Sequence, residues 1–194
     1  MNYGELKAAV AGWINRTDLT ADIATIIEMA EATIRTDVRV SAMESIVTGA
    51  LVDGSVALPA RYLEARTLLV GGKVHEFVTS DQYQAELEVS STLRHYTVFA
   101  GSLYVINGGT SSYSLLCYRW FEPFASDTDT NWLLTNYPNV YLYQALKQAA
   151  VYVKDANAAA GYELLYQQAK SGVNGVDKAG RQSGSMVIRP RVVA

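Results

Sequence analysis

Few side chains in this 194-residue sequence are suited to catalysis or metal binding. The two histidines, His75 and His95, stand beside charged residues in predicted strands, and neither has a second ligand at a metal-site spacing. The one cysteine, Cys117, lies mid-strand between apolar neighbours, where a small buried hydrophobic side chain is expected. The sequence shows no base placed to activate it. We therefore predict no catalytic residue and no enzyme activity.

The segment Asp127 to Asn131 has acidic or amide side chains at positions one, three and five of a calcium-binding loop. However, Trp132 stands where such a loop needs glycine, and Pro138 where it needs a bidentate glutamate. We expect a polar loop whose side chains cap turns, with a weak surface cation site as the alternative. The glycine pairs at 71–72 and 108–109 lack a phosphate-binding frame and predict hairpin turns. No metal and no cofactor is predicted.

Composition indicates a globular protein that does not grip nucleic acid. Apolar residues make up 49% of the chain, charged residues 18%, and the net charge is −3. Basic residues follow Asp177 without any acid, which favours a contact with protein, or less readily with DNA. The single cysteine excludes an intrachain disulfide framework. Without a secretory start or a long apolar run, we expect no membrane contact and production in the cytoplasm.

The elements that must position these residues change from helical to strand periodicity and back. Leu6, Val10 and Ile14 predict a first helix, and a second follows Thr20 as its N-cap. From Met43 the period falls to about two, which predicts strands with a hairpin turn at 53–54. The predicted strands are 46–48, 51–52, 55–58, 65–70, 73–78, 96–99, 103–106 and 113–121, with a short helix over 80–87 capped by Ser80.

Two further helices are predicted after the strands, one from Pro138 and one from Ala158 to about Asp177. In the last helix, Gly161 and Leu165 fall along one side with other small residues, a spacing that lets two helices approach closely. The predicted fold class is α+β. It is a discontinuous antiparallel bundle of four helices, residues 1–42 and 125–180, with an inserted small antiparallel β-domain, residues 43–124, and an extended C-terminal tail, residues 181–194.

Four segments, residues 3–19, 30–40, 56–66 and 131–146, resemble the head-to-tail adaptor (connector) proteins of tailed bacteriophages. The last, from Asn131 through Tyr137-Pro138 to Leu146, is similar to that family's entry into its third long helix. The resemblance extends from residue 3 to about 180 and preserves the order of the segments.

This resemblance implies a structural virion protein of the phage neck and viral tail. It implies a homo-oligomeric ring, commonly a dodecamer, that joins the portal protein to a downstream tail or nozzle protein. DNA would pass through the lumen during ejection without specific binding. The portal or a neighbouring subunit is expected to contact Arg181, Met186, Val187, Ile188, Arg189, Pro190, Arg191 and Val192. Neighbouring subunits are expected to contact Tyr141, Tyr143, Tyr152, Tyr162 and Tyr166.

Two other readings of the sequence stay open. Another neck or tail-completion subunit would share this composition but bind a different partner. A carbohydrate-binding module of the tail is suggested by aromatic side chains on the predicted strands, namely Tyr96, Tyr104, Tyr113, Tyr118 and Trp120.

Overall fold

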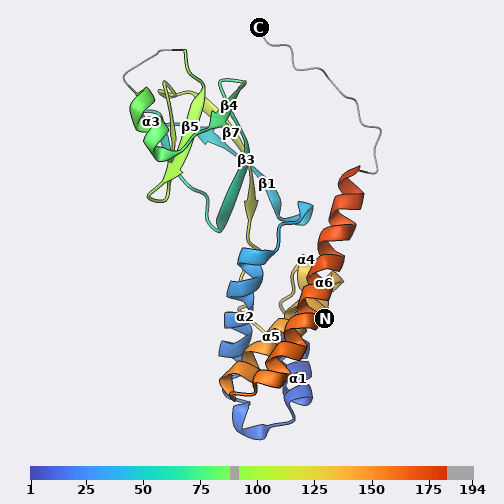
Figure 1. The fold of residues 1–194 in the computed structure, drawn as a ribbon. Coiled ribbons are helices and arrows are strands. Elements are labelled where there is room, and N and C mark those ends of the chain that lie inside the picture. Colours follow the sequence, from blue (N-terminus) through green and yellow to red (C-terminus); the bar gives the residue numbers. More distant parts are fainter. Residues whose placement is uncertain (88–91, 183–194) are drawn as a thin grey trace. The chain divides into compact units, whose positions relative to one another are not determined.

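Residues 1–87 and 92–182 are described in the computed structural model, and they belong to two compact units (Figure 1). The first unit combines Met1–Ala42 with the chain from Phe121 onward, and the second is Met43–Trp120. The predicted four-helix bundle with a small antiparallel β-domain is wrong. The described residues form six α-helices and a seven-stranded, nearly closed sheet that contains one parallel strand pair.

The first unit is helical. Asn2 begins its first helix with a capping box, in which its side-chain oxygen accepts from the Glu5 N–H at 2.8 Å and its own N–H donates to the Glu5 carboxylate at 2.9 Å. The helices of this unit are α1 (Tyr3–Ile14), α2 (Ile23–Asp37), α4 (Trp132–Asn136), α5 (Pro138–Tyr152) and α6 (Ala156–Gln182), with 3-10 turns at Thr17–Leu19 and Ser41–Met43.

Several helix boundaries differ from the sequence-based expectation. Helix α2 begins after Asp22 rather than at a Thr20 cap. Helix α4 was not predicted. Helix α6 starts at Ala156 and continues to Gln182, so the first two residues of the predicted tail are helical. The rest of that tail, residues 183–194, lies outside the described residues.

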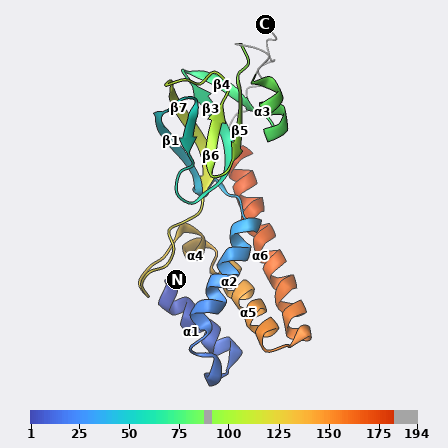
Figure 2. The same ribbon diagram turned by 90° about the vertical axis from the view of Figure 1, so that its left-hand side faces the viewer.

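The core of the helical unit forms around α5, which contacts α1, α2, α4 and α6 (Figure 2). Pro138 occupies its first turn, where the absent N–H breaks no hydrogen bond. Fully buried side chains come from α5 itself and from each neighbouring helix; they are Leu6, Ile27, Ile34, Leu133, Leu146 and Tyr166. Each buried Leu or Ile stabilises the fold by about 1.5–3 kcal/mol relative to an exposed one.

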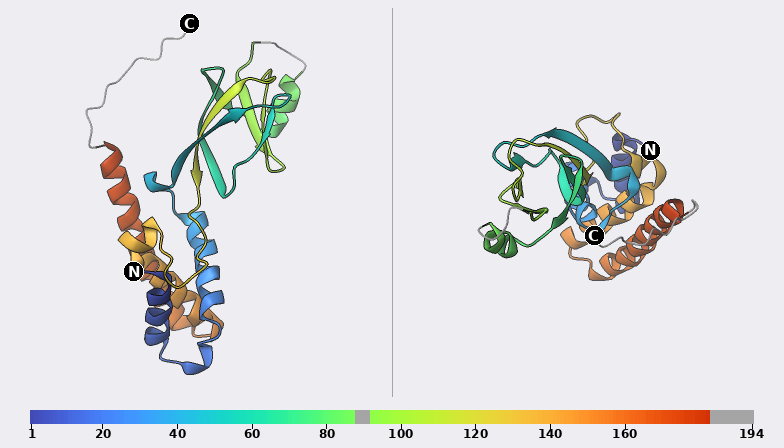
Figure 3. Two further views of the ribbon diagram at one scale, coloured as in Figure 1. Left: turned by 180° about the vertical axis from the view of Figure 1, so that it is seen from behind. Right: turned by 90° about the horizontal axis from the view of Figure 1, so that it is seen from above.

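The second unit is a curled sheet with one helix, α3 (Ser80–Glu86) (Figure 3). The helix is capped by Thr79 instead of Ser80. The strands are β1 (Glu44–Ala50), β2 (Ser55–Ala57), β3 (Tyr62–Val70), β4 (Lys73–Phe77), β5 (His95–Phe99), β6 (Ser102–Val105) and β7 (Ser112–Arg119). Their order is β1-β7-β3-β4-β5-β6-β2, and β4 and β5 pair in parallel.

The turn at Asp53-Gly54 brings the two edges of this sheet together. Both residues have positive φ, and a single bridge joins Val52 to Ser55. The flanking strands pair elsewhere, β1 with β7 and β2 with β6, so the turn nearly closes the sheet instead of forming a simple hairpin. The predicted hairpin between β3 and β4 is confirmed, with Val70 opposite Lys73.

Candidate assembly surface of the helical unit

Helix α6 packs one side against the rest of the helical unit. Tyr166 and Val173 are fully buried on this side, and Tyr162 and Asp177 are half-buried at the same helical spacing. The Tyr166 hydroxyl donates to the Asp37 carboxylate of α2 at 2.9 Å, and the Lys170 ammonium lies 3.2 Å from the same oxygen. These contacts fix the rotation of α6 about its axis and thereby decide which side faces outward.

Two carboxylates at this contact are held in their charged form. Burial of Asp37 opposes its charge, but the hydrogen bonds from Tyr166 and Lys170 outweigh burial and lower its pKa. The pKa of Asp177 is also lowered, because hydrogen bonds from Ser41 and the charge of Arg181 outweigh the effect of burial. Both ends of this helix-to-helix contact therefore rest on charge-assisted hydrogen bonds.

The exposed surface of α6 includes a stripe of apolar and small residues, which is interrupted by the exposed Ser171 and bordered by the exposed Lys178. Leu164 is 74% exposed and Val176 is 60% exposed. Residues at three- and four-residue intervals continue this stripe over about five turns. The α6 outer face consists of Ala160, Gly161, Leu164, Leu165, Gln168, Gly172, Gly175, Val176 and Ala179.

The glycines of the α6 outer face do not pack against any other part of the described chain. A Cβ added at Gly161, Gly172 or Gly175 would meet no atom within 4 Å. Glycine inside a helix costs about 1 kcal/mol relative to alanine, so each of them lowers the stability of the helix. A surface without side chains also lets the axis of a second helix come close. The α6 outer face has the composition of a helix-packing seam, and no other described helix of this unit covers it.

A second apolar surface lies between the C-terminal ends of α1 and α5 and the start of α6. It is a groove of about 260 Å³. Trp13 is 54% exposed at its edge, and its ring meets Tyr143 edge-on at 6.2 Å between centroids. The groove is lined by Trp13, Ile14, Arg16, Leu146, Ala149, Ala150, Val153, Asp155, Ala158 and Tyr162.

The predicted inter-subunit tyrosines fall into two groups. Tyr141 and Tyr166 are core residues of the helical unit, at 0% and 1% exposure, and their contacts with a neighbouring subunit stay a prediction. The Tyr141 hydroxyl accepts a hydrogen bond from Asn131 at 2.9 Å. Tyr152 is 59% exposed. Tyr143 and Tyr162 are half-buried beside the groove, and contacts of these three with a neighbour stay a prediction.

Of the predicted portal contacts, Arg181 is the one that the structure describes. It is exposed in the last turn of α6, and its Nε lies 2.7 Å from the Asp177 carboxylate. The other seven, from Met186 to Val192, lie outside the described residues. The sequence predicts the interface in the tail and on tyrosines, and the exposed Leu164 and Val176 were not among the predicted residues.

The calcium-like segment caps helix α1. The carbonyls of Asp127 and Asp129 accept from the N–H groups of Gly4 and Tyr3, each at 2.8 Å. The Asp129 carboxylate accepts from the backbone N–H and the hydroxyl of Ser126, which lower its pKa. These bonds identify a polar loop with a structural role. The described residues contain no cluster of three or more acidic, histidine or cysteine side chains that could hold a metal ion.

The remaining chemistry-bearing residues lie in the sheet unit and are not brought together. His95 contacts Glu86 of α3, with its Nδ1 2.6 Å from the carboxylate. The Nδ1 of His75 lies 3.0 Å from the Lys73 carbonyl. Cys117 is fully buried, and burial raises the pKa of its thiol, which disfavours the reactive thiolate.

The aromatic side chains that suggested a sugar-binding surface are mostly in the core. Tyr96, Tyr118 and Trp120 are between 3% and 4% exposed, and Tyr113 is 9% exposed. Of the five, Tyr104 alone is half-exposed, stacked on Phe99 at 4.2 Å between centroids. Because sugars stack on the faces of accessible rings, these residues do not form a carbohydrate platform.

Comparison with known proteins identifies the family. None of the described helices is both long and apolar enough to span a membrane. No match was found among curated proteins. The family model of the SU10 adaptor protein matches residues 1–191, which is nearly the whole chain. The chain therefore belongs to the SU10 adaptor family, and the predicted resemblance to phage head-to-tail adaptors is confirmed.

Proposed function

We propose that this phage adaptor assembles into a ring of identical subunits that joins the portal to the tail and lines the DNA exit channel. The observation that carries the ring is the α6 outer face, an apolar, glycine-rich helix surface with Leu164 74% exposed. An exposed stripe of this length is an aggregation liability in a monomer and a contact surface in an oligomer. The partner that covers the α6 outer face is a second copy of this chain.

A ring of identical subunits uses two different surfaces on each copy, because its contacts are heterologous and close by rotation. The α6 outer face is one of these surfaces. The groove beside Trp13 is the other, since it is largely apolar and concave where the outer face presents Leu164, which is 74% exposed. Exposed Tyr152 supplies further contact area. A dodecamer is the number that the family resemblance favours.

The portal contact is assigned to the C-terminal segment after Gln182. Its sequence combines Val187 and Ile188 with Arg189-Pro190-Arg191, an apolar and basic combination suited to extended binding along a partner surface. The net charge of −3 suits a channel through which DNA slides without being gripped. A tail or nozzle protein would bind the side of the ring away from the portal. An adaptor with these two partners would lie in the virion neck.

Glycine-to-leucine substitutions test the ring contact, with a matched control inside the same unit. Gly175→Leu puts a large side chain on the α6 outer face, and Gly12→Leu does the same on α1, where an added Cβ also meets nothing within 4 Å. Leucine favours helix, so both variants fold. Sedimentation velocity with purified portal protein should show loss of the ring for Gly175→Leu and its retention for Gly12→Leu. Equal assembly by the two variants would reject the α6 contact.

A further inference from the structure

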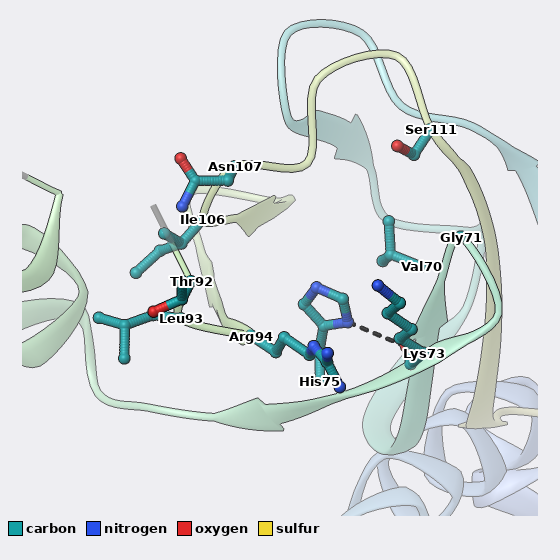
Figure 4. A pocket seen from close by; sticks show the side chains of 10 residues that line it. All are labelled: Val70, Gly71, Lys73, His75, Thr92, Leu93, Arg94, Ile106, Asn107 and Ser111. Carbon is teal, nitrogen blue, oxygen red and sulfur yellow. Dashed lines mark hydrogen bonds between the residues drawn. The ribbon is translucent and has the colours of Figure 1, made fainter. Parts of the chain in front are cut away.

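The sheet unit contains a pocket of about 400 Å³ at one end of the sheet (Figure 4). This volume lies within the roughly 300–1,000 Å³ that is usual for ligand pockets. Its walls come from the turn between β3 and β4, the chain that enters β5, and the turns after β6. It is lined by Val70, Gly71, Lys73, His75, Thr92, Leu93, Arg94, Ile106, Asn107 and Ser111.

Three nitrogen-bearing side chains gather on one wall of this pocket. Lys73 and His75 are two residues apart in β4, so their side chains leave the same face of the strand. The backbone of Arg94 is held next to β4, because its carbonyl accepts from the Glu76 N–H at 2.8 Å where β4 and β5 pair in parallel, and its side chain is exposed. Figure 4 shows the ends of Lys73, His75 and Arg94 close to one another, with Asn107 and Ser111 across the opening.

The polar groups that line the pocket are matched to an anion. Lys73 and Arg94 supply two fixed positive charges. Hydroxyl and amide donors come from Thr92, Ser111 and Asn107. Among the described residues that line it, none is a carboxylate. In a chain of net charge −3, this local excess of positive charge and donors is the opposite of the overall balance.

We propose that this pocket binds a phosphate group. A phosphate carries a charge of about −1.5 to −2 near neutral pH and offers several acceptor oxygens in three dimensions. It therefore matches two fixed cations, an imidazole and neutral donors better than a planar carboxylate of single charge. The group is either free inorganic phosphate or a phosphate of a nucleic-acid backbone. This site is in the sheet unit and is independent of the ring contact of α6.

Calorimetric titration of the full-length protein with inorganic phosphate at constant ionic strength tests the proposal. The pocket variant is Lys73→Gln with Arg94→Gln. The matched control is Lys154→Gln with Lys178→Gln, which removes the same charge from exposed positions of the helical unit. We expect wild type and control to bind phosphate, and the pocket variant to bind at least about tenfold more weakly, since charge-assisted hydrogen bonds are lost.

Two further titrants complete the design. Acetate should bind more weakly than phosphate, and equal binding of acetate would overturn the assignment to phosphate. A short DNA oligonucleotide that competes with phosphate, and loses affinity in the pocket variant, would identify a nucleic-acid phosphate as the source. Phosphate binding without such competition would identify the free anion. If wild type binds neither probe, or if the pocket and control variants bind equally, the proposal is wrong.

Discussion

Replacing Gly172 with alanine should stabilise the isolated subunit. Gly172 is an exposed residue well inside α6, and a Cβ built there meets no atom within 4 Å. The substitution therefore adds helix propensity without a clash, a gain of about 1 kcal/mol in the free energy of unfolding. Urea unfolding followed by far-ultraviolet circular dichroism, in dilute protein below the concentration of assembly, measures the difference. Unchanged or lower stability would refute the conclusion that the glycine has no packing role within the subunit.

Gly4→Ala in α1 is the matched comparison. Its Cβ would lie 3.0 Å from the Asp127 Cβ and 3.2 Å from the Asp127 carbonyl oxygen, which accepts the Gly4 N–H. The same chemical change should therefore give no gain, or a loss, because the loop that caps α1 must move. If both variants gain the same stability, the distance from the added Cβ to its neighbours does not decide whether the substitution stabilises. The explanation of the α6 glycines would then be wrong.

Three other outcomes follow from the structure. Asp37→Asn should cost about 1–2 kcal/mol at neutral pH by weakening the bonds from Tyr166 and Lys170. Folding lowers the pKa of Asp37. This stabilisation is therefore present above the pKa of the unfolded chain, about 3.9, and is lost as pH falls through the lower pKa of the folded protein. The free energies of unfolding of wild type and variant in urea should therefore converge in acid. Cys117 should react with a thiol reagent only when the protein unfolds, and fast labelling of the native protein would contradict its burial. Truncation after Gln182 should leave the melting temperature unchanged and weaken portal binding, and unchanged binding in a pull-down would contradict the assigned role of that segment.

The parts of the fold that the sequence predicts are those with a repeating local pattern. The 3.6-residue spacing of Leu6, Val10 and Ile14 marks α1, and the glycine pair Gly71-Gly72 between two predicted strands marks the β3–β4 hairpin. Helix α4 spans only five residues, too few for a period to show. The order of the strands depends on pairing of β1 with the distant β7, which leaves no local signal.

The candidate surface was only partly visible in the sequence. The spacing of Gly161 and Leu165 indicated close helix packing, but it did not reveal that this side of α6 faces outward. The orientation is set by Tyr166, which is buried and bonded to Asp37. Tyrosine is equally suited to a core and to an interface, so its abundance alone could not separate Tyr141 and Tyr166 from Tyr152.

Electron microscopy of the purified protein mixed with its portal protein tests the central claim most directly. We expect a closed ring of this chain seated on one face of the portal, with α6 at the contacts between neighbouring subunits. Portal particles without an added ring, in a mixture in which both proteins remain folded, would contradict the proposed ring.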